Sequence, residues 1–244
     1  MSPSRLRALP TAIALAAVAL LATGCASSPA SPAPTSGADS APASHDHADV
    51  MPDHLDAAWL DDGRAIGIVT WGSSTPACRP AQVDATADGQ TITVTLTGSP
   101  EASKGCDADL GPRADMIGVP EGVDVTKDVA VKVEGGTASE TLRLSALEER
   151  PDGTGAQGAS AGWFGDDGIV LLTWGSSSCV PEVGDVRMSD AGATVTLGTT
   201  TDMCTMDYAP RVTPILLPEP ADRGAPFELT LVGGNLDGTV AVIG

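Results

Sequence analysis

The sequence predicts an all-β protein, built as a tandem repeat of two small disulfide-bonded β-sandwich-like domains after a signal peptide and a disordered linker. Two copies of one unit fill the chain after residue 52, short runs of alternating apolar residues dominate both copies, and each copy carries two cysteines. The predicted parts are a signal peptide at 1–24, a linker at 25–52, a first repeat at 53–149, a Gly-rich linker at 150–160 and a second repeat at 161–244.

The N-terminal segment has the features of a bacterial lipoprotein precursor. Arg5 and Arg7 precede an apolar run over residues 8–22 that is too short for a stable membrane span, which is the pattern of a secretion signal. The run ends in Leu-Ala-Thr-Gly-Cys, which looks like a lipobox, the motif whose cysteine is acylated and becomes the first residue of the mature chain. We therefore expect Cys25 to carry lipid and to hold the protein on the extracytoplasmic face of the cell membrane.

The composition bears on partners and on the linker. The formal net charge is −19, and a surface of that sign repels nucleic acid and anionic lipid headgroups. We therefore expect no nucleic-acid partner and no membrane attachment apart from the lipid. Residues 25–52 are rich in Ala, Ser and Pro and lack apolar periodicity, so they are expected to form a mobile spacer.

The two repeats agree at many ordered positions. The stretch TWGSSTPAC at 70–78 returns as TWGSSSC at 173–179, and CDADLGPRADMIGVPE aligns with CTMDYAPRVTPILLPE without a gap. In each repeat β-branched residues alternate with threonine or charged residues, as in TITVTLT at 91–97. Such alternation is typical of half-buried strands, and we expect about seven short strands in each repeat.

Four cysteines remain after Cys25, an even number that suits an oxidising compartment. We favour one disulfide inside each repeat, because duplication copies a unit that already folds. The favoured pairs are Cys78 with Cys106 and Cys179 with Cys204. Each bridge is expected to stabilise its repeat by about 3 kcal/mol.

The repeated Gly-Ser-Ser raises the question of a catalytic serine. Serine catalysis needs a base within hydrogen-bond reach of the hydroxyl, and neither repeat has a histidine after His54. We therefore interpret the serines as turn residues; they are Ser73, Ser74, Ser176 and Ser177. The repeated carboxylates leave a carboxylate-dependent hydrolase as an alternative, and they are Asp109, Glu121, Asp207 and Glu219.

The segment HDHADVMPDH at 45–54 is a candidate metal site. His45, His47 and His54 are interspersed with carboxylates and a thioether, a donor set that suits Zn²⁺ or copper. A metal-binding envelope protein using this segment is therefore the other alternative. Apart from such weakly bound Zn or Cu, no cofactor is expected.

Four tryptophans also recur, and a tryptophan beside a disulfide usually fills the core. They are Trp59, Trp71, Trp163 and Trp174. An exposed tryptophan could stack on a sugar or a peptide, and the candidate ligand contacts are Trp71 and Trp174.

The combination Trp-Gly-Ser-Ser-x(1–3)-Cys, then Cys-x2-Asp-x2-Pro-Arg and a later Pro-Glu, resembles a group of uncharacterised actinobacterial secreted lipoproteins with one or two such units. The likeness covers nearly all of the chain after residue 53. It implies the fold unit and the location, and it carries no established activity. We therefore expect a non-enzymatic, lipid-anchored binding or interaction protein of the bacterial cell envelope, with an unidentified envelope ligand or protein as its partner.

Overall fold

The computed structural model describes residues 54–73, 75, 78–99, 105–135, 138–149, 157–198 and 203–244. The expected signal peptide at 1–24, the lipid site at Cys25 and the linker at 25–52 lie outside the described residues. All of these described residues belong to one compact unit of the chain.

The described residues contain fourteen β-strands and no α-helix, which confirms the all-β class. The first repeat contains β1 (Leu55–Leu60), a 3₁₀ turn (Asp61–Gly63), β2 (Ala65–Gly72), β3 (Gln82–Asp88), β4 (Thr91–Thr97), β5 (Gly111–Gly118), β6 (Val129–Gly135) and β7 (Ala138–Leu144). The second repeat contains β8 (Ser160–Phe164), β9 (Gly168–Gly175), β10 (Glu182–Ser189), β11 (Gly192–Gly198), β12 (Ala209–Leu216), β13 (Glu228–Gly233) and β14 (Gly238–Ile243). No helix in this part of the chain has the length and apolar character of a membrane span.

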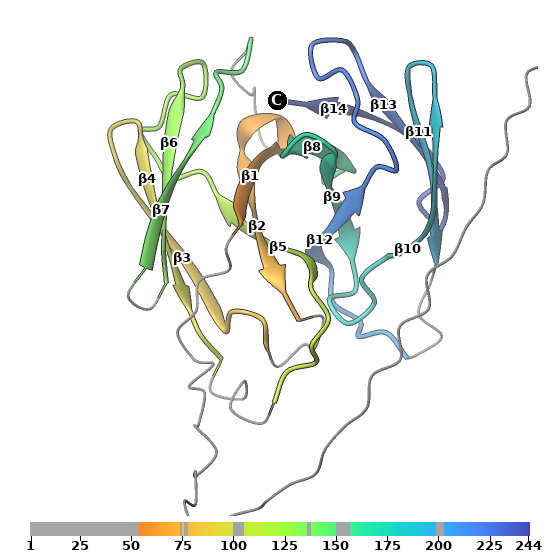
Figure 1. The fold of residues 1–244 in the computed structure, drawn as a ribbon, viewed down its shortest axis with the longest axis horizontal. Coiled ribbons are helices and arrows are strands. Elements are labelled where there is room, and N and C mark those ends of the chain that lie inside the picture. The colour runs from red at the N-terminus through yellow and green to blue at the C-terminus, as the bar shows by residue number, and fades with distance from the viewer. Residues whose placement is uncertain are drawn as a thin grey trace, which may run out of the picture. The chain divides into compact units, whose positions relative to one another are not determined.

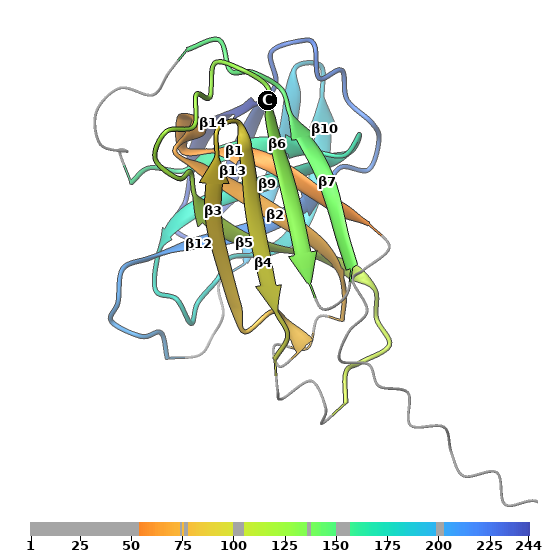
Figure 2. The same cartoon turned by 90° about the vertical axis from the view of Figure 1, so that its left-hand side faces the viewer.

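The strands form three sheets, and equivalent strands of the two repeats pair in the same order within each group. In the first repeat, β1-β2-β5 and β3-β4-β6-β7 are separate sheets. In the second, the matching groups join into one seven-stranded sheet of order β10-β11-β13-β14-β8-β9-β12. Figure 1 shows the groups side by side, with β3, β4, β6 and β7 on the left and β10, β11, β13 and β14 on the right. Figure 2 shows the four strands of the first repeat face-on.

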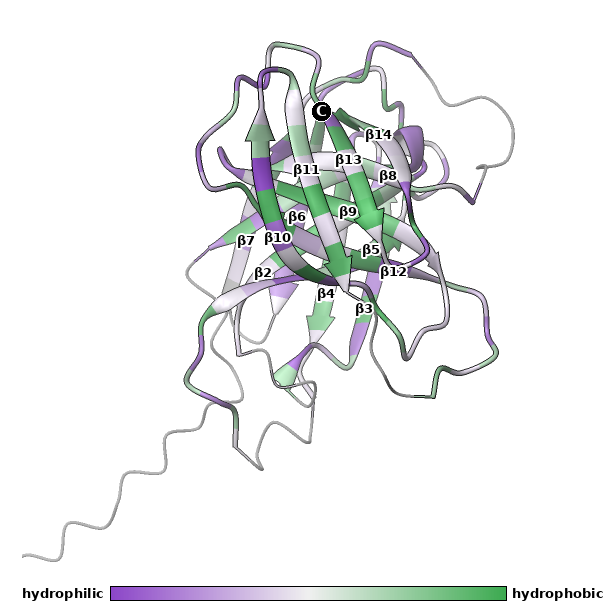
Figure 3. Ribbon diagram, turned by 90° about the vertical axis from the view of Figure 1, so that its right-hand side faces the viewer, coloured by the Kyte–Doolittle hydropathy of each residue, from purple (hydrophilic) through white to green (hydrophobic). Residues whose placement is uncertain are grey.

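The four-stranded groups bury one face, as their alternating sequences predict. Ile92 and Val94 of β4 are fully buried and pack in one cluster with Ile66 and Ile68 of β2. The threonines between them are partly or fully exposed. In the second repeat, Val195 of β11 belongs to the equivalent cluster. Figure 3 shows the resulting change between polar and apolar residues along β11.

The central strands β2 and β9 bury both faces. Ile169 and Leu171 of β9 face the cluster inside the second repeat, while Val170 and Leu172 belong to a third cluster. That third cluster draws on both repeats, and its buried members are Ala58, Leu60, Ala65, Val69, Ala114, Phe164, Val170 and Leu172. A Cβ on Gly67 of β2 would lie 3.2 Å from Val170 of β9. The apolar runs AIGIVTWG and GIVLLTWG are therefore strands buried on both sides.

This shared cluster corrects the expectation that each repeat forms its own small β-sandwich-like domain. The sheets instead follow one another in a stacked, solenoid-like arrangement within one compact unit. The physical reason is that β2 and β9 each carry an apolar face that a separate domain would leave in water.

The two repeats approach each other closely where β8 crosses β1. A Cβ on Gly162 would collide with the backbone carbonyl oxygen of Trp59. Beside this point the backbone N–H of Asp61 donates to the Ser160 hydroxyl at 2.8 Å. The crossing therefore requires a residue without a side chain at position 162.

The expected disulfide pairing is confirmed. Cys78 pairs with Cys106 across 28 residues of sequence, and Cys179 pairs with Cys204 across 25 residues. Loops of this length correspond to about 3 kcal/mol each in the chain-entropy model.

The close crossing gives a stability prediction. Gly162→Ala should lower the free energy of unfolding by about 1–3 kcal/mol, because β8 and β1 must separate to admit the methyl group. Gly111→Ala is the matched control, since a Cβ there meets nothing within 4 Å. Its effect should stay within about 0.5 kcal/mol. Urea denaturation of both variants provides the measurement, and equal effects would contradict the close approach.

Candidate functional site

Each repeat ends its Trp-Gly strand in a disulfide corner, which we define as the end of β2 or β9 with the two loops that the disulfide joins. In the first corner the hydroxyl of Ser73 donates to that of Thr75 at 3.0 Å, and Thr75 donates to the Asp107 carboxylate at 2.9 Å. The backbone N–H of Asp107 returns a bond to the Thr75 hydroxyl at 3.3 Å. These hydroxyls therefore join the loops to each other.

An arginine holds each corner together. Arg113 donates to the carbonyl oxygens of Ser73 at 3.2 Å and Cys78 at 2.7 Å. Arg211 donates to those of Cys179 at 2.7 Å and Trp174 at 3.2 Å. Burial lowers the pKa of both guanidinium groups. Charge-assisted bonds of this kind are stronger than neutral ones, so each arginine ties its loop to the neighbouring strand.

The glycine of the Trp-Gly pair makes room for this arginine. A Cβ on Gly72 would lie 2.5 Å from Nη2 of Arg113, and one on Gly175 would lie 2.8 Å from Cζ of Arg211. In both repeats the strand that carries the arginine, β5 or β12, pairs antiparallel with the Trp-Gly strand. The arginine follows by two residues the position that pairs with the glycine. The repeated Trp-Gly and Pro-Arg motifs therefore serve one packing arrangement.

The second corner holds a carboxylate with a lowered pKa. The side chain of Thr205 donates to Asp207, and the backbone N–H of Ser177 donates to it at 3.2 Å. These bonds, that from Thr205 first, lower the pKa of Asp207 from the usual 3.8 to about 2. A general acid needs a pKa near the working pH, so Asp207 stays ionised and organises the turn.

The structure separates the repeated carboxylates. Asp109 precedes β5 and Glu121 follows it, so an eight-residue strand lies between them. Eight extended residues span roughly 25 Å, whereas the carboxyl pair of a glycosidase lies about 5–9.5 Å apart. Asp207 and Glu219 flank β12 in the same way.

The tryptophans divide into two classes. Trp59 and Trp163 are buried, at 1% and 2% exposure, and fill the cores of their repeats. Trp71 and Trp174 are half-exposed at the disulfide corners. The Trp174 ring stacks on Tyr208, with 6.0 Å between ring centroids. The two candidate ligand contacts are therefore the accessible members of the set.

Large apolar side chains extend into solvent at the second corner. Met203 and Met206 are fully exposed, at 98% and 104%, and Tyr208 is 61% exposed. We name Trp174, Met203, Met206 and Tyr208 the corner patch. Its methionines are not among the expected site residues, although their positions on either side of Cys204, in a loop, were a usable signal.

The metal segment is mostly outside the described residues, because the structure does not describe His45 and His47. His54 is exposed and directly precedes β1. Among the described side chains, no group of three or more His, Cys, Asp or Glu could hold a metal ion.

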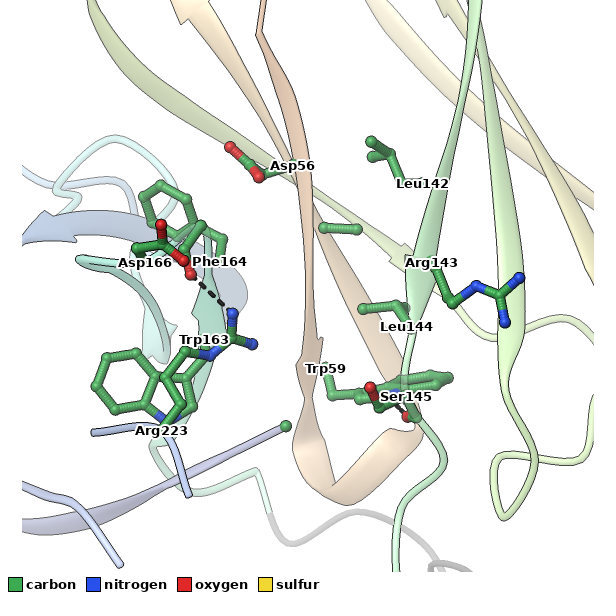
Figure 4. Close-up of a pocket in the computed structure, with 13 residues that line it drawn as sticks. Asp56, Trp59, Leu142, Arg143, Leu144, Ser145, Trp163, Phe164, Asp166 and Arg223 are labelled. Atoms are coloured by element: carbon green, nitrogen blue, oxygen red, sulfur yellow. Dashed lines mark hydrogen bonds between the residues drawn. The ribbon is translucent and has the colours of Figure 1, made fainter. Parts of the chain in front are cut away.

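A cavity of about 260 Å³ lies where β1, β7 and the turn after β8 meet (Figure 4). We name it the seam cavity, and its walls are formed by Asp56, Ala57, Trp59, Leu142–Ser145, Trp163–Asp166, Arg223 and Gly244. Burial raises the pKa of the Asp56 carboxyl, which accepts a bond from the backbone of Gly165. Sequence reasoning missed this cavity, because it depends on how far apart β1 and β7 lie.

Comparisons with protein-family models, curated proteins and solved structures return no match for this chain. Its function is therefore argued from the geometry of the corners and the cavity.

Asp207 gives a pH prediction. Its folded-state pKa is depressed, so its contribution to stability is complete above about pH 4 and is lost as the pH falls from 3.8 to about 2. Asp207→Asn should remove this part of the acid dependence. Unfolding midpoints measured from pH 6 to pH 2 provide the test, with Asp190→Asn on an exposed turn as the control. If the unfolding midpoint of Asp207→Asn falls between pH 4 and pH 2 as steeply as that of the wild type, the lowered pKa of Asp207 is contradicted.

Proposed function

We propose that this chain is a lipid-anchored, extracytoplasmic binding or interaction protein of the bacterial cell envelope, and that it binds through the corner patch without catalysing a reaction. The lipobox-like sequence ending at Cys25 supports the location. The observation that carries the binding role is the exposure of Met203, Met206 and Tyr208 on an acidic protein. Clustered exposed apolar side chains commonly mark interaction sites.

The corner patch combines side chains that favour binding. Tryptophan and tyrosine are enriched among the residues that dominate binding energy, and methionine adapts to irregular surfaces. The Cys179–Cys204 disulfide and Arg211 restrain the loops that present them. Because this restraint exists before binding, less conformational entropy is lost when a ligand docks.

The first repeat lacks these side chains at the matching positions. It has Gly105, Ala108 and Leu110 where the second repeat has Met203, Met206 and Tyr208. Both repeats keep the cysteines and the arginine, so the difference is confined to the surface. This divergence favours a ligand that contacts the second corner.

The chemistry of the patch restricts the ligand. The stacked rings of Trp174 and Tyr208 offer an apolar face, and ionised Asp207 lies in the same corner as a hydrogen-bond acceptor. A ligand with both an apolar face and hydroxyl or amide donors meets these requirements. Sugars and peptides of the cell wall belong to this class.

Soluble muropeptides and cell-wall glycan fragments are the probes for this function. A ligand present at 100 times its Kd should stabilise the protein by about 2.7 kcal/mol, which a thermal-shift measurement detects. Met203→Ser and Tyr208→Ala should abolish that shift, while the free variants unfold near the wild-type midpoint, because both side chains are exposed.

Leu110→Ala is the matched control in the first repeat, and it should keep the full shift. Failure of every envelope fragment to stabilise the wild type, or an equal loss in Leu110→Ala, would contradict binding at the corner patch.

A further inference from the structure

The two repeats differ at the seam between the four-stranded group and the three-stranded group. In the second repeat β14 pairs in parallel with β8, through Val242 with Ala161 and Ile243 with Gly162. In the first repeat the equivalent strands β7 and β1 end separate sheets. The two strand groups are therefore joined by main-chain pairing in the second repeat and are not joined in the first.

The seam cavity lies at this unpaired junction. Aligning the repeats places Ala57 at the position of Ala161 and Leu144 at that of Val242. Both Ala57 and Leu144 line the cavity, and the Trp59 indole N–H reaches across to the carbonyl oxygen of Ser145 at 2.8 Å. The cavity thus occupies the place that main-chain pairing fills in the second repeat.

The strands along the cavity, like the edge strand β3, lack the proline residues and the register shift found at the other three sheet edges in the described residues. Proline interrupts the outer strands β5 and β12, and the register of β10 shifts between Val183 and Asp185. In contrast, β1 and β7 contain no proline and keep continuous register with their partners. An unprotected strand edge is a template for pairing with another chain.

The charge around the cavity favours a cationic occupant. Within the described residues, no lysine or arginine forms an ion pair with Asp56. Burial raises the pKa of its carboxyl, the nearby charge of His54 lowers that pKa, that of Glu140 raises it, and that of Arg223 lowers it. Arg143 pairs with Asp128 at 3.1 Å and points away from the cavity (Figure 4). Arg223 lies over the Trp163 ring and donates to the carbonyl oxygen of Gly165 at 2.8 Å. Arg143 and Arg223, the two arginines on the cavity wall, therefore already have partners.

The geometry points to the seam cavity as a docking site for an extended, basic peptide segment of another protein. Its main chain pairs with the free strand edge as β14 pairs with β8, and its lysine or arginine side chain meets Asp56. The volume of about 260 Å³ lies below the roughly 300–1,000 Å³ of small-molecule pockets, so the cavity takes one side chain of the segment while the main chain lies along the strand edge outside it. This site is separate from the corner patch and goes beyond the proposed function.

The test uses the hexapeptide acetyl-Lys-Val-Lys-Val-Lys-Val-amide, titrated into the full chain by calorimetry. Two companion probes replace lysine by glutamate or carry N-methyl groups on alternate backbone nitrogens. We expect the lysine peptide to bind and both companions to lose binding. In the protein, Asp56→Asn and, separately, Glu140→Gln should weaken binding, by about tenfold for Asp56→Asn. Amide NMR shifts should change in β1 and β7.

Asp84→Asn on β3, at the opposite edge of the same sheet, is the matched control and should bind as the wild type does. Tyr208→Ala should also bind normally, which separates this site from the corner patch. The proposal is overturned if the wild type does not bind the lysine peptide, or if the glutamate or N-methyl peptide binds equally well. Changes in the β7 amides that grow with protein concentration in the absence of peptide would place a second copy in the seam and also overturn it.

Discussion

The arrangement of this protein depends on one apolar contact, the layer that β2 and β9 share. Each strand faces its own repeat with one set of side chains and the other repeat with the next set. Burial on both faces accounts for the unbroken apolar runs AIGIVTWG and GIVLLTWG, and it removes both runs from water. Because neither repeat can cover its second face alone, the two copies stack into one unit.

The shared layer also positions the surface features. Each Trp-Gly strand ends just outside the shared layer, where its tryptophan and the following cysteine belong to a disulfide corner. Arg113 or Arg211 holds that corner together. The strand β8 crosses β1 at Gly162, and β7 ends its sheet beside the seam cavity. Duplication thus provides two copies of a disulfide corner, and divergence at Tyr208 and its neighbouring methionines gives the second corner more exposed apolar side chains than the first.

The sequence predicts the elements well, because alternation such as TITVTLT depends only on local burial. It also predicts the disulfide pairs, since duplication preserves a unit that folds. The stacking was missed even though Val69 and Val170 interrupt the alternation of their strands and signal a second buried face. The seam cavity could not be predicted, because it depends on tertiary distances between β1 and β7. The roles of Arg113 and Gly72 become clear only from their contact.

Through the shared layer, the two repeats form one structure. The most direct measurement cuts the chain between them, at a protease site placed within residues 150–156, and follows the products by size-exclusion chromatography. We expect both fragments to stay together in one folded species, with the elution volume of the intact protein, until denaturant separates them. Two separately eluting fragments that each keep native β-structure would contradict this expectation.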